Sequence, residues 1–270
     1  MRKLQFYLGL ALVGLVVSAA LVSLVWTPYD PLQVVPADRL LGPSPAHPFG
    51  TDGFGIDIAS RLLVGARYCL LVGIVSVTLA ALVGVPLGIL AGQVGGWVSE
   101  VVMRLTDIVY ALPALLLAIL LAAIFGGSTL TAMAAIGVAT VPAFARTARA
   151  GTLQVMAADY VLAARACGTR GVALAARHIW PNIAALAGVQ ASIGFAMAIL
   201  AEAALGYLGL GTPRPTPTWG TMLRDSQEFL FTAPLQALWP GLAIAVAVLG
   251  FNLLGDGIRD LTDPRLREAS

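Results

Sequence analysis

The stretch AADYVLAARACGTRGVALAARHIWP, residues 157–181, is a charged segment that lies between two long apolar ones. It holds three arginines, a histidine and an aspartate, and charged side chains are costly inside a bilayer. Asp159–Cys167 is predicted to form a short helix, and Gly168 follows where a left-handed residue ends a helix. A second helical piece runs to His178, and Pro181 lies where a new helix would begin. We interpret the segment as a surface that meets a partner in water.

The composition of the whole chain is that of a membrane protein. Hydrophobic residues make up 59% of the 270 residues and charged residues 11%, whereas a soluble domain has about 25% charged residues. Because a span needs about 20 apolar residues, we predict an all-α, polytopic membrane protein with six transmembrane helices. The predicted spans are Leu4–Trp26, Tyr68–Gln93, Thr106–Phe125, Thr129–Phe144, Asn182–Leu205 and Ala233–Leu254. A polar turn is predicted over 95–107, and a kink is predicted at Pro113 within the third span.

The cationic residues orient these spans. Arg2 and Lys3 precede the first apolar segment, which is too long for a signal peptide and is interpreted as an uncleaved span. With this start inside, eleven of the 16 lysines and arginines lie on the inner side, as the positive-inside rule predicts. Both termini and the segment 157–181 are then cytoplasmic. The predicted regions are 1–66 (first helix and external loop), 67–258 (a core with spans two to six) and 259–270 (a cytoplasmic tail).

Glycines recur every four residues along the inner half of the second predicted span. They are Gly84, Gly88, Gly92 and Gly96. Small residues at this spacing let another helix approach closely, so we predict a helix-packing face there.

Enzymatic chemistry is not predicted for this chain. A phosphate-binding loop of the GxxxxGK[ST] type needs a lysine after its glycines, and the only lysine is Lys3. His47 and His178 fall on opposite sides of the predicted membrane, so they do not form a metal site together. The net charge of +2 gives no basis for nucleic-acid binding. We therefore predict no catalytic residue, metal or cofactor in the chain itself.

Three acidic residues lie close to the ends of predicted spans, and one of them, Asp256, lies near Arg259 at the inner end of the sixth span. Asp107 is three residues from Arg104, which predicts an ion pair at a helix end. Glu202 lies near the outer end of the fifth span, where it either shapes the outer mouth or anchors the helix at the membrane surface.

Five segments, in order along the chain, resemble the dipeptide/oligopeptide/nickel family of ABC-importer permeases, and within it the C-type subunits. Residues 157–181 are similar to the cytoplasmic EAA loop of that family, in which a coupling helix docks into a groove on an ATPase. The other segments are HPFGTDGFGIDIASRLLVGAR (47–67), MRLTDIVYALPALLLAI (103–119), EAALGYLGLGTPRPTPTWGTML (202–223) and PGLAIAVAVLGFNLLGDGIRDLTDPRLR (240–267).

The resemblance implies a type I ABC importer permease fold in a bacterial inner membrane. The implied partners are a homologous second permease subunit, two ATPase subunits that hold ATP and Mg, an extracytoplasmic solute-binding protein and the lipid bilayer. The implied ATPase-coupling residues are Asp159, Tyr160, Leu162, Ala163, Ala164, Arg165 and Gly168. Glu202 and Trp219 are expected at the outer mouth or in contact with the binding protein.

Two positions depart from the family pattern. Leu162 stands where the family usually has the glutamate of its Glu-Ala-Ala triplet, and Ile56 stands where an arginine is common. Asp159 lies one helical turn before Leu162 and offers a carboxylate on nearly the same helix face.

The function that the resemblance implies is import of di- or oligopeptides, with ATP binding and hydrolysis in a partner ATPase driving alternating access. Nickel and haem are the alternative cargoes. The alternative class is a secondary transporter or channel that needs no ATPase, which would show inverted repeats and ionisable residues at mid-depth.

Overall fold

The computed structural model describes residues 2–262, and these residues form an all-helical bundle. Five helices are long and apolar enough to cross a membrane, and a sixth crossing is formed if one bent pair of helices counts as a span. This confirms the predicted all-α membrane fold. The five are α1 (Arg2–Val25), α2 (Ile58–Val94), α5 (Thr129–Met156), α8 (Trp180–Leu208) and α10 (Leu235–Thr262). Most of the tail predicted over 259–270 lies outside the described residues.

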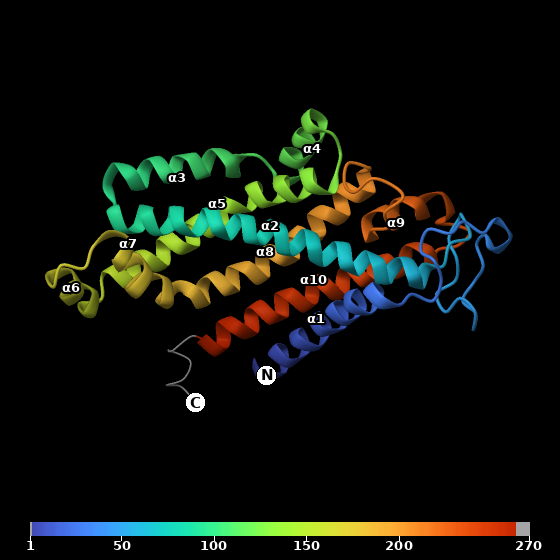
Figure 1. Cartoon of the computed structure of the whole chain (residues 1–270), viewed down its shortest axis with the longest axis horizontal. Coiled ribbons are helices and arrows are strands. Elements are labelled where there is room, and N and C mark those ends of the chain that lie inside the picture. The colour runs from blue at the N-terminus through green and yellow to red at the C-terminus, as the bar shows by residue number, and fades with distance from the viewer. Residues whose placement is uncertain (1, 263–270) are drawn as a thin grey trace.

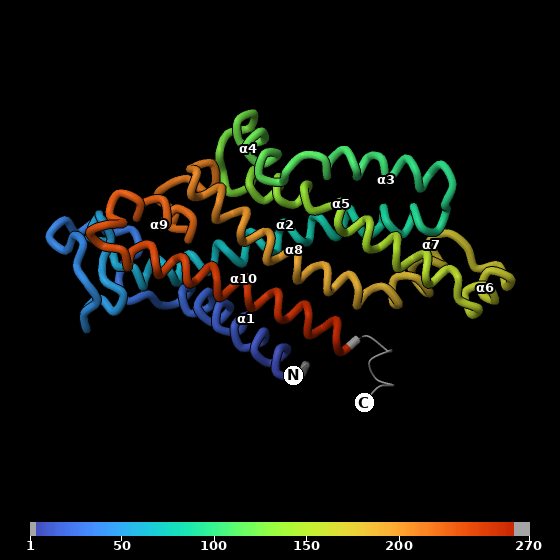
Figure 2. Tube along the Cα trace, turned by 180° about the vertical axis from the view of Figure 1, so that it is seen from behind, coloured from blue at the N-terminus to red at the C-terminus, as the bar shows by residue number. Residues whose placement is uncertain are grey.

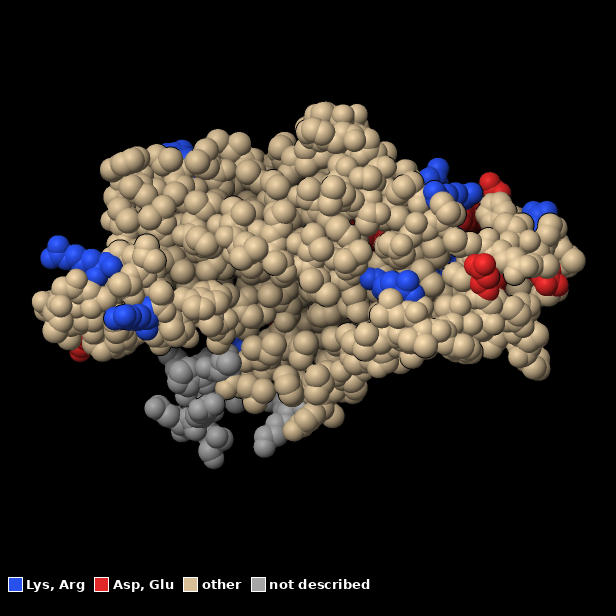
Figure 3. Space-filling model, in the orientation of Figure 1, with Lys and Arg blue, Asp and Glu red and all other residues tan. Residues whose placement is uncertain are grey.

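The long helices lie side by side, so the bundle has two ends (Figures 1 and 2). One end carries the short helix α6 (Asp159–Ala166), and we name it the α6 end. The opposite end carries residues 26–57 and the short helix α9 (Trp219–Ser226), and we name it the α9 end. Helix α2 packs along α5, α1 packs along α10, and α8 contacts α2, α5 and α10. Charged side chains gather toward the two ends, and the broad middle of the face in Figure 3 is mostly uncharged.

Helix α2 begins earlier than the predicted start at Tyr68. Asp57 is its N-cap: the Oδ2 atom accepts hydrogen bonds from the Ser60 N–H at 2.8 Å and from the Ser60 hydroxyl at 2.7 Å. Arg61 lies in the first turn and is neutralised by ion pairs within the protein. Arg61, which the sequence pattern assigns to the external loop, therefore belongs to helix α2.

The third predicted span is a pair of helices joined at a sharp bend. Helix α3 (Gly96–Ala111) and α4 (Ala114–Phe125) meet at 80°. Pro113 lies at the junction, as predicted, because its ring removes a backbone donor and restricts the residue before it. The segment 95–107, which the sequence predicts as a polar turn, is helical from Gly96 onward.

Helix α5 continues past its predicted end at Phe144. Two arginines within its second half have partners on α3: Arg146 pairs with Asp107 at 2.8 Å, and the Arg149 Nε–H donates to the Ser99 hydroxyl at 2.8 Å. Because these side chains are satisfied by a neighbouring helix, they do not end α5.

The break predicted at His178 is absent. Helix α7 (Gly171–Leu174), the π-helical turn η2 (Ala175–Ile179) and α8 form one continuous helix from Gly171 to Leu208. Pro181 has no N–H and cannot complete an α-helical hydrogen bond. The wider π turn accommodates it, and the Trp180 N–H bonds to the Ala175 carbonyl. The segment that follows α6 is thus mechanically continuous with a long helix.

Three glycines on α2 let α5 approach at backbone distance. A Cβ atom added to Gly84 would lie 2.6 Å from the Phe144 Cβ, and one added to Gly92 would lie 2.7 Å from the Thr152 Cβ. A Cβ on Gly88 would overlap the carbonyl oxygen of Ala145. We name Gly84, Gly88 and Gly92 the glycine seam. Gly96 has open space around it and takes no part.

Candidate functional site

Helix α6 is short and its end is set by glycine. The helix covers Asp159–Ala166, Cys167 follows as its C-cap, and Gly168 has φ +89°. The Thr169 N–H closes the turn by donating to the Ala164 carbonyl at 3.0 Å. A side chain at Gly168 would meet no atom within 4 Å, so backbone conformation rather than space favours glycine there.

A single side chain of α6 is buried, and the others face outward or are half-buried. Val161 is 0% exposed and belongs to the main core cluster. Tyr160 is 48% exposed and Leu162 is 50% exposed. Asp159, Ala163, Arg165 and Gly168 are also exposed, and Ala164 is half-buried. The residues that the sequence assigns to coupling are therefore brought together on one exposed element at the tip of the α6 end (Figure 1).

The surface around α6 extends onto the turn that follows it. Val172 is 85% exposed at the start of the helix that leads into α8. The Gln93 side chain, at the end of α2, donates to the Gly171 carbonyl at 3.0 Å. The connection is thus attached to α2 and α8, and α6 itself follows directly on α5. An exposed apolar surface with such an anchorage can transmit a push or pull to three long helices.

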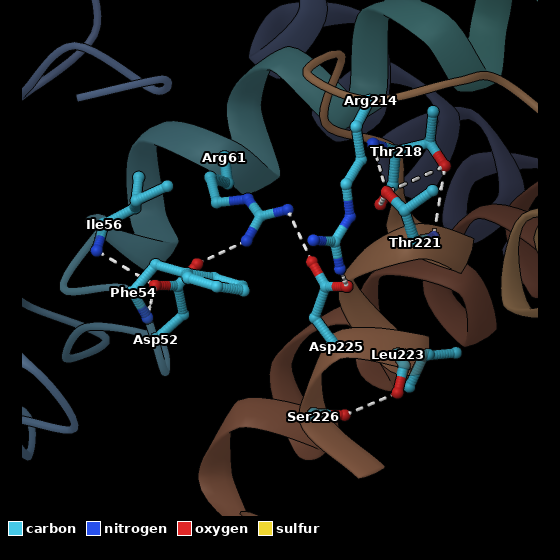
Figure 4. Close-up of polar contacts among 10 residues, drawn as sticks. All are labelled: Asp52, Phe54, Ile56, Arg61, Arg214, Thr218, Thr221, Leu223, Asp225 and Ser226. Atoms are coloured by element: carbon cyan, nitrogen blue, oxygen red, sulfur yellow. Dashed lines mark hydrogen bonds and ion pairs between the residues drawn. The ribbon is translucent and has the colours of Figure 1, made fainter. Parts of the chain in front are cut away.

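A chain of charged residues joins distant segments at the α9 end, and short-range sequence patterns give no sign of it. Arg61 of α2 pairs with Asp52 in the preceding loop and with the Asp225 Oδ2 of α9 at 3.2 Å. The other Asp225 oxygen pairs with Arg214. Figure 4 shows the Arg61 guanidinium between the two carboxylates. Asp225 lies 164 residues after Arg61, so the fold alone brings them together.

A second buried group supports the same loop. The His47 Nδ1 lies 3.0 Å from the Asp57 Oδ1, and the Tyr29 ring stacks on the His47 ring at 4.6 Å. The Tyr29 N–H also donates to the Ser60 hydroxyl at 3.0 Å. His47, for which the sequence predicts no metal site with His178, is part of the loop's packing.

Glu202 and Trp219, expected at the outer mouth, are both buried inside the described chain. Glu202 is 2% exposed, and its Oε1 has no hydrogen-bond partner among the described residues. The Trp219 indole N–H donates to the Leu62 carbonyl at 3.1 Å. In this conformation neither side chain is available for direct contact with an external protein.

The predicted pair between Asp107 and Arg104 is wrong. Arg104 pairs with Glu100 at 3.6 Å, one helical turn away, and both side chains are exposed. Asp107 faces α5 instead and pairs with Arg146, whose guanidinium lies 4.2 Å from the Tyr110 ring centre. Glu100 lies four residues before Arg104 and Asp107 three residues after it, so both spacings allow a pair on one helix. The contact of Asp107 with α5 leaves Glu100 as the partner of Arg104.

The two cysteines differ in accessibility. Cys69 is buried within α2, and Cys167 is exposed at the end of α6. Both are free thiols.

Comparison with known proteins gives the context for this geometry. Residues 84–268 match the family model described as "Binding-protein-dependent transport system inner membrane component". The chain is 45% identical over 267 residues to the dipeptide transport system permease protein DppC of Escherichia coli, covering 96% of this chain and 89% of that protein. It is 42% identical over 263 residues to DppC of Alkalihalophilus pseudofirmus, covering 96% and 86%. It is also 42% identical over 241 residues to the glutathione transport system permease protein GsiD of Pectobacterium atrosepticum, covering 89% and 80%.

Solved structures support the fold. A chain from inward-facing conformations of the MetNI methionine ABC transporter superposes with a TM-score of 0.62 at 18% identity, covering 75% of this chain and 97% of that chain. The architecture is therefore that of a type I ABC importer permease. From the family match and the relatives' identity over most of the sequence, we conclude that this multi-pass membrane protein belongs to the family of binding-protein-dependent transport system inner membrane components, the permeases of ABC importers.

Proposed function

We propose that the chain is one permease subunit of an ATP-driven importer of di- and oligopeptides. The family supports the transport role, and the names of the relatives, dipeptide and glutathione transport permeases, support a peptide cargo. The observation that carries the mechanism is α6: a short helix with one buried side chain, set between α5 and the helix that becomes α8.

The α6 end is proposed to face the cytoplasm. Arg146, Arg149, Arg165, Arg170 and Arg177 lie on the second half of α5 or on the segment from α6 to η2. Such an excess of arginine is expected on the cytoplasmic side. The start of α1 and the end of α10 lie near each other in Figure 2, which fits the prediction that both termini share one side. The α9 end then faces outward.

The partners of the subunit follow from this orientation. One of the two ATPase subunits, which hold ATP and Mg, would dock at α6, and a homologous second permease would complete the pathway across the membrane. A solute-binding protein would deliver peptide to the α9 end. The chain itself is assigned no catalytic residue and no cofactor.

The coupling step is a rigid-body transfer. When the ATPases close on ATP, the groove that holds α6 moves. Because the groove contacts α6 differently in the nucleotide-free and ATP-bound states, it shifts the equilibrium between the inward-open and outward-open arrangements of the spans. Tyr160, Leu162 and Val172 offer the exposed apolar area for that contact. Val161 links the docked helix to the core, and the continuous helix from Gly171 carries the displacement into α8.

Asp159 is proposed to supply the acidic contact that Leu162 does not. Both side chains are exposed on α6, so both can reach a partner. We expect Asp159→Ala to weaken association with the ATPase subunits by about 0.2–1 kcal/mol, as for an exposed charged contact. Adding Leu162→Glu should restore part of the loss. Pull-down titration of the ATPase against the purified permease measures both. Glu100→Ala, which removes an exposed carboxylate on α3 away from α6, is the control, and an unchanged affinity in Asp159→Ala would leave that carboxylate without a role.

Reconstitution tests the function as a whole. The chain is assembled in liposomes with the second permease, the ATPases and the binding protein, and uptake of a labelled dipeptide is followed. We expect uptake that requires ATP and the binding protein. Uptake driven by an ion gradient without ATPase would instead indicate a secondary transporter. ATP-dependent uptake of nickel or haem in place of dipeptide would contradict the proposed cargo.

A further inference from the structure

Helix α9 is held against two long helices at once. On the α8 side, a Cβ added to Gly206 would lie 3.1 Å from the Gly220 Cα. On the α2 side, the Trp219 indole donates to the Leu62 carbonyl, and a Cβ on Gly65 would lie 2.5 Å from the Trp219 Cδ1. Contacts at backbone distance leave little room for sliding. Helix α9 therefore joins the first turns of α2 to the last turns of α8.

One guanidinium extends this joint to the loop of residues 26–57. Arg61 connects Asp52 of the loop to Asp225 of α9 (Figure 4). The Asp52 Oδ1 accepts hydrogen bonds from the Phe54 N–H at 2.8 Å and the Ile56 N–H at 2.9 Å, so the loop's own backbone fixes this carboxylate. The loop, the start of α2 that follows it and the distant helix α9 thus share one cation.

The bridge is buried, so it requires an arginine at position 61. The Arg61 side chain is 9% exposed, and those of Asp52 and Asp225 are each 8% exposed. Removal of the Arg61 guanidinium would leave the two buried carboxylates without their shared partner, which would strongly destabilise the folded protein. The planar fork of arginine serves two carboxylates at fixed angles, which a lysine ammonium does not. Arg214 differs, because it reaches Asp225 from the surface with its side chain 63% exposed.

We propose that Arg61 is a positioning residue that makes the loop 26–57, the start of α2, α9 and the end of α8 one rigid body throughout the transport cycle. The proposal rests on the proposed importer function. Its consequence is that the pathway at the α9 end opens along the border between this body and the partner permease, and not between α2 and α8 of this chain. Motion that enters through α6 and α8 then displaces the loop and α9 together.

Spin-label distances in the assembled importer test the rigid body. Labels are placed at Pro45→Cys in the loop and at Glu228→Cys after α9, both exposed positions, with Cys167→Ser to remove the exposed native thiol. We expect one narrow distance distribution that is the same in the nucleotide-free and ATP-trapped states. A distance that changes between these states in the otherwise unaltered protein overturns the proposal.

Substitutions at Arg61 test the residue. We expect Arg61→Met to broaden the distribution and to lower uptake per ATP hydrolysed by about fivefold or more, within the range typical of coupling between sites. The width of the distance distribution and the uptake per ATP of Arg61→Lys should lie between those of Arg61→Met and of the unaltered protein. The matched control Arg214→Gln should keep a narrow distance distribution and normal uptake. A narrow distribution in Arg61→Met would show that Arg61 does not position α9.

A neutral triple variant separates positioning from stability. Arg61→Met combined with Asp52→Asn and Asp225→Asn removes the buried charges altogether, so we expect recovery of any lost folded yield. The distribution should remain broad and uptake per ATP low. Normal coupling in this variant would mean that the bridge only stabilises the fold, and would overturn the proposal. Failure of the importer function is distinguishable, because such a complex would not assemble with the ATPases or take up dipeptide before any substitution at Arg61 is made.

Discussion

Replacing Gly88 by valine is expected to destabilise the folded protein strongly and to lower its melting temperature and yield. A Cβ at this position would overlap the Ala145 carbonyl oxygen and lie 2.7 Å from the Ala148 Cβ. Overpacking against side chains costs about 1–3 kcal/mol. Here the obstacle is backbone of α5, which cannot rotate away, so we expect at least about 3 kcal/mol, a large part of a typical stability of about 5–15 kcal/mol. Size-exclusion profiles and thermal unfolding in detergent measure the loss.

Gly188→Val is the matched control for this prediction. Gly188 lies on α8 within a long helix, as Gly88 does, but a Cβ there would meet no atom within 4 Å. We expect its melting temperature and yield to stay close to those of the unaltered chain. An equal loss in both variants would assign the effect to glycine content in helices and not to the seam.

The second large effect is expected at Gly168, where an aspartate should abolish uptake while the protein still folds and inserts. The φ of +89° costs a residue with a side chain about 1–2 kcal/mol, and the added carboxylate would project from the proposed docking surface. A clash at the centre of such a surface costs about 2 kcal/mol or more, which lowers affinity about 30-fold. Dipeptide uptake and ATPase co-purification are measured together with the yield of folded permease.

Gly96→Asp controls for backbone strain. Gly96 has φ +52°, open space around it, and a place at the start of α3 at the same end of the bundle. We expect this variant to keep uptake, because it places a side chain at a positive φ away from α6. If Gly96→Asp and Gly168→Asp abolish uptake alike, the loss reflects strain in general. A bulky change on the helix, Ala164→Trp, should reproduce the loss without any strained backbone.

The sequence predicts features that depend on neighbouring residues. The short helix after Asp159, the left-handed glycine that follows it and the bend at Pro113 each rest on local backbone chemistry, and the structure has all three. The number of spans follows from apolar length in the same way. These features need no knowledge of what lies across the bundle.

Features that depend on distant partners are missed. The sequence assigns Arg61 to a loop and places Arg146 and Arg149 beyond the end of a span, yet all three lie inside helices because another segment neutralises or hydrogen-bonds them. The pairing rule for neighbours on one helix assigned Asp107 to Arg104, whereas a helix 39 residues away supplies its partner. Buried charges are the one signal that could have pointed to the α9-end bridge, and burial is not readable from one sequence.

The unequal exposure of the two thiols turns the protein into its own reporter. A maleimide should modify Cys167 at the tip of α6 and leave Cys69 untouched in the folded state. The labelling rate then reads out occupancy of this tip without any engineered residue. If a candidate partner covers the tip of α6, the labelling rate of Cys167 should fall as the partner is added, and the titration gives its affinity. A rise in the labelling rate on adding nucleotide would report when the partner leaves this site.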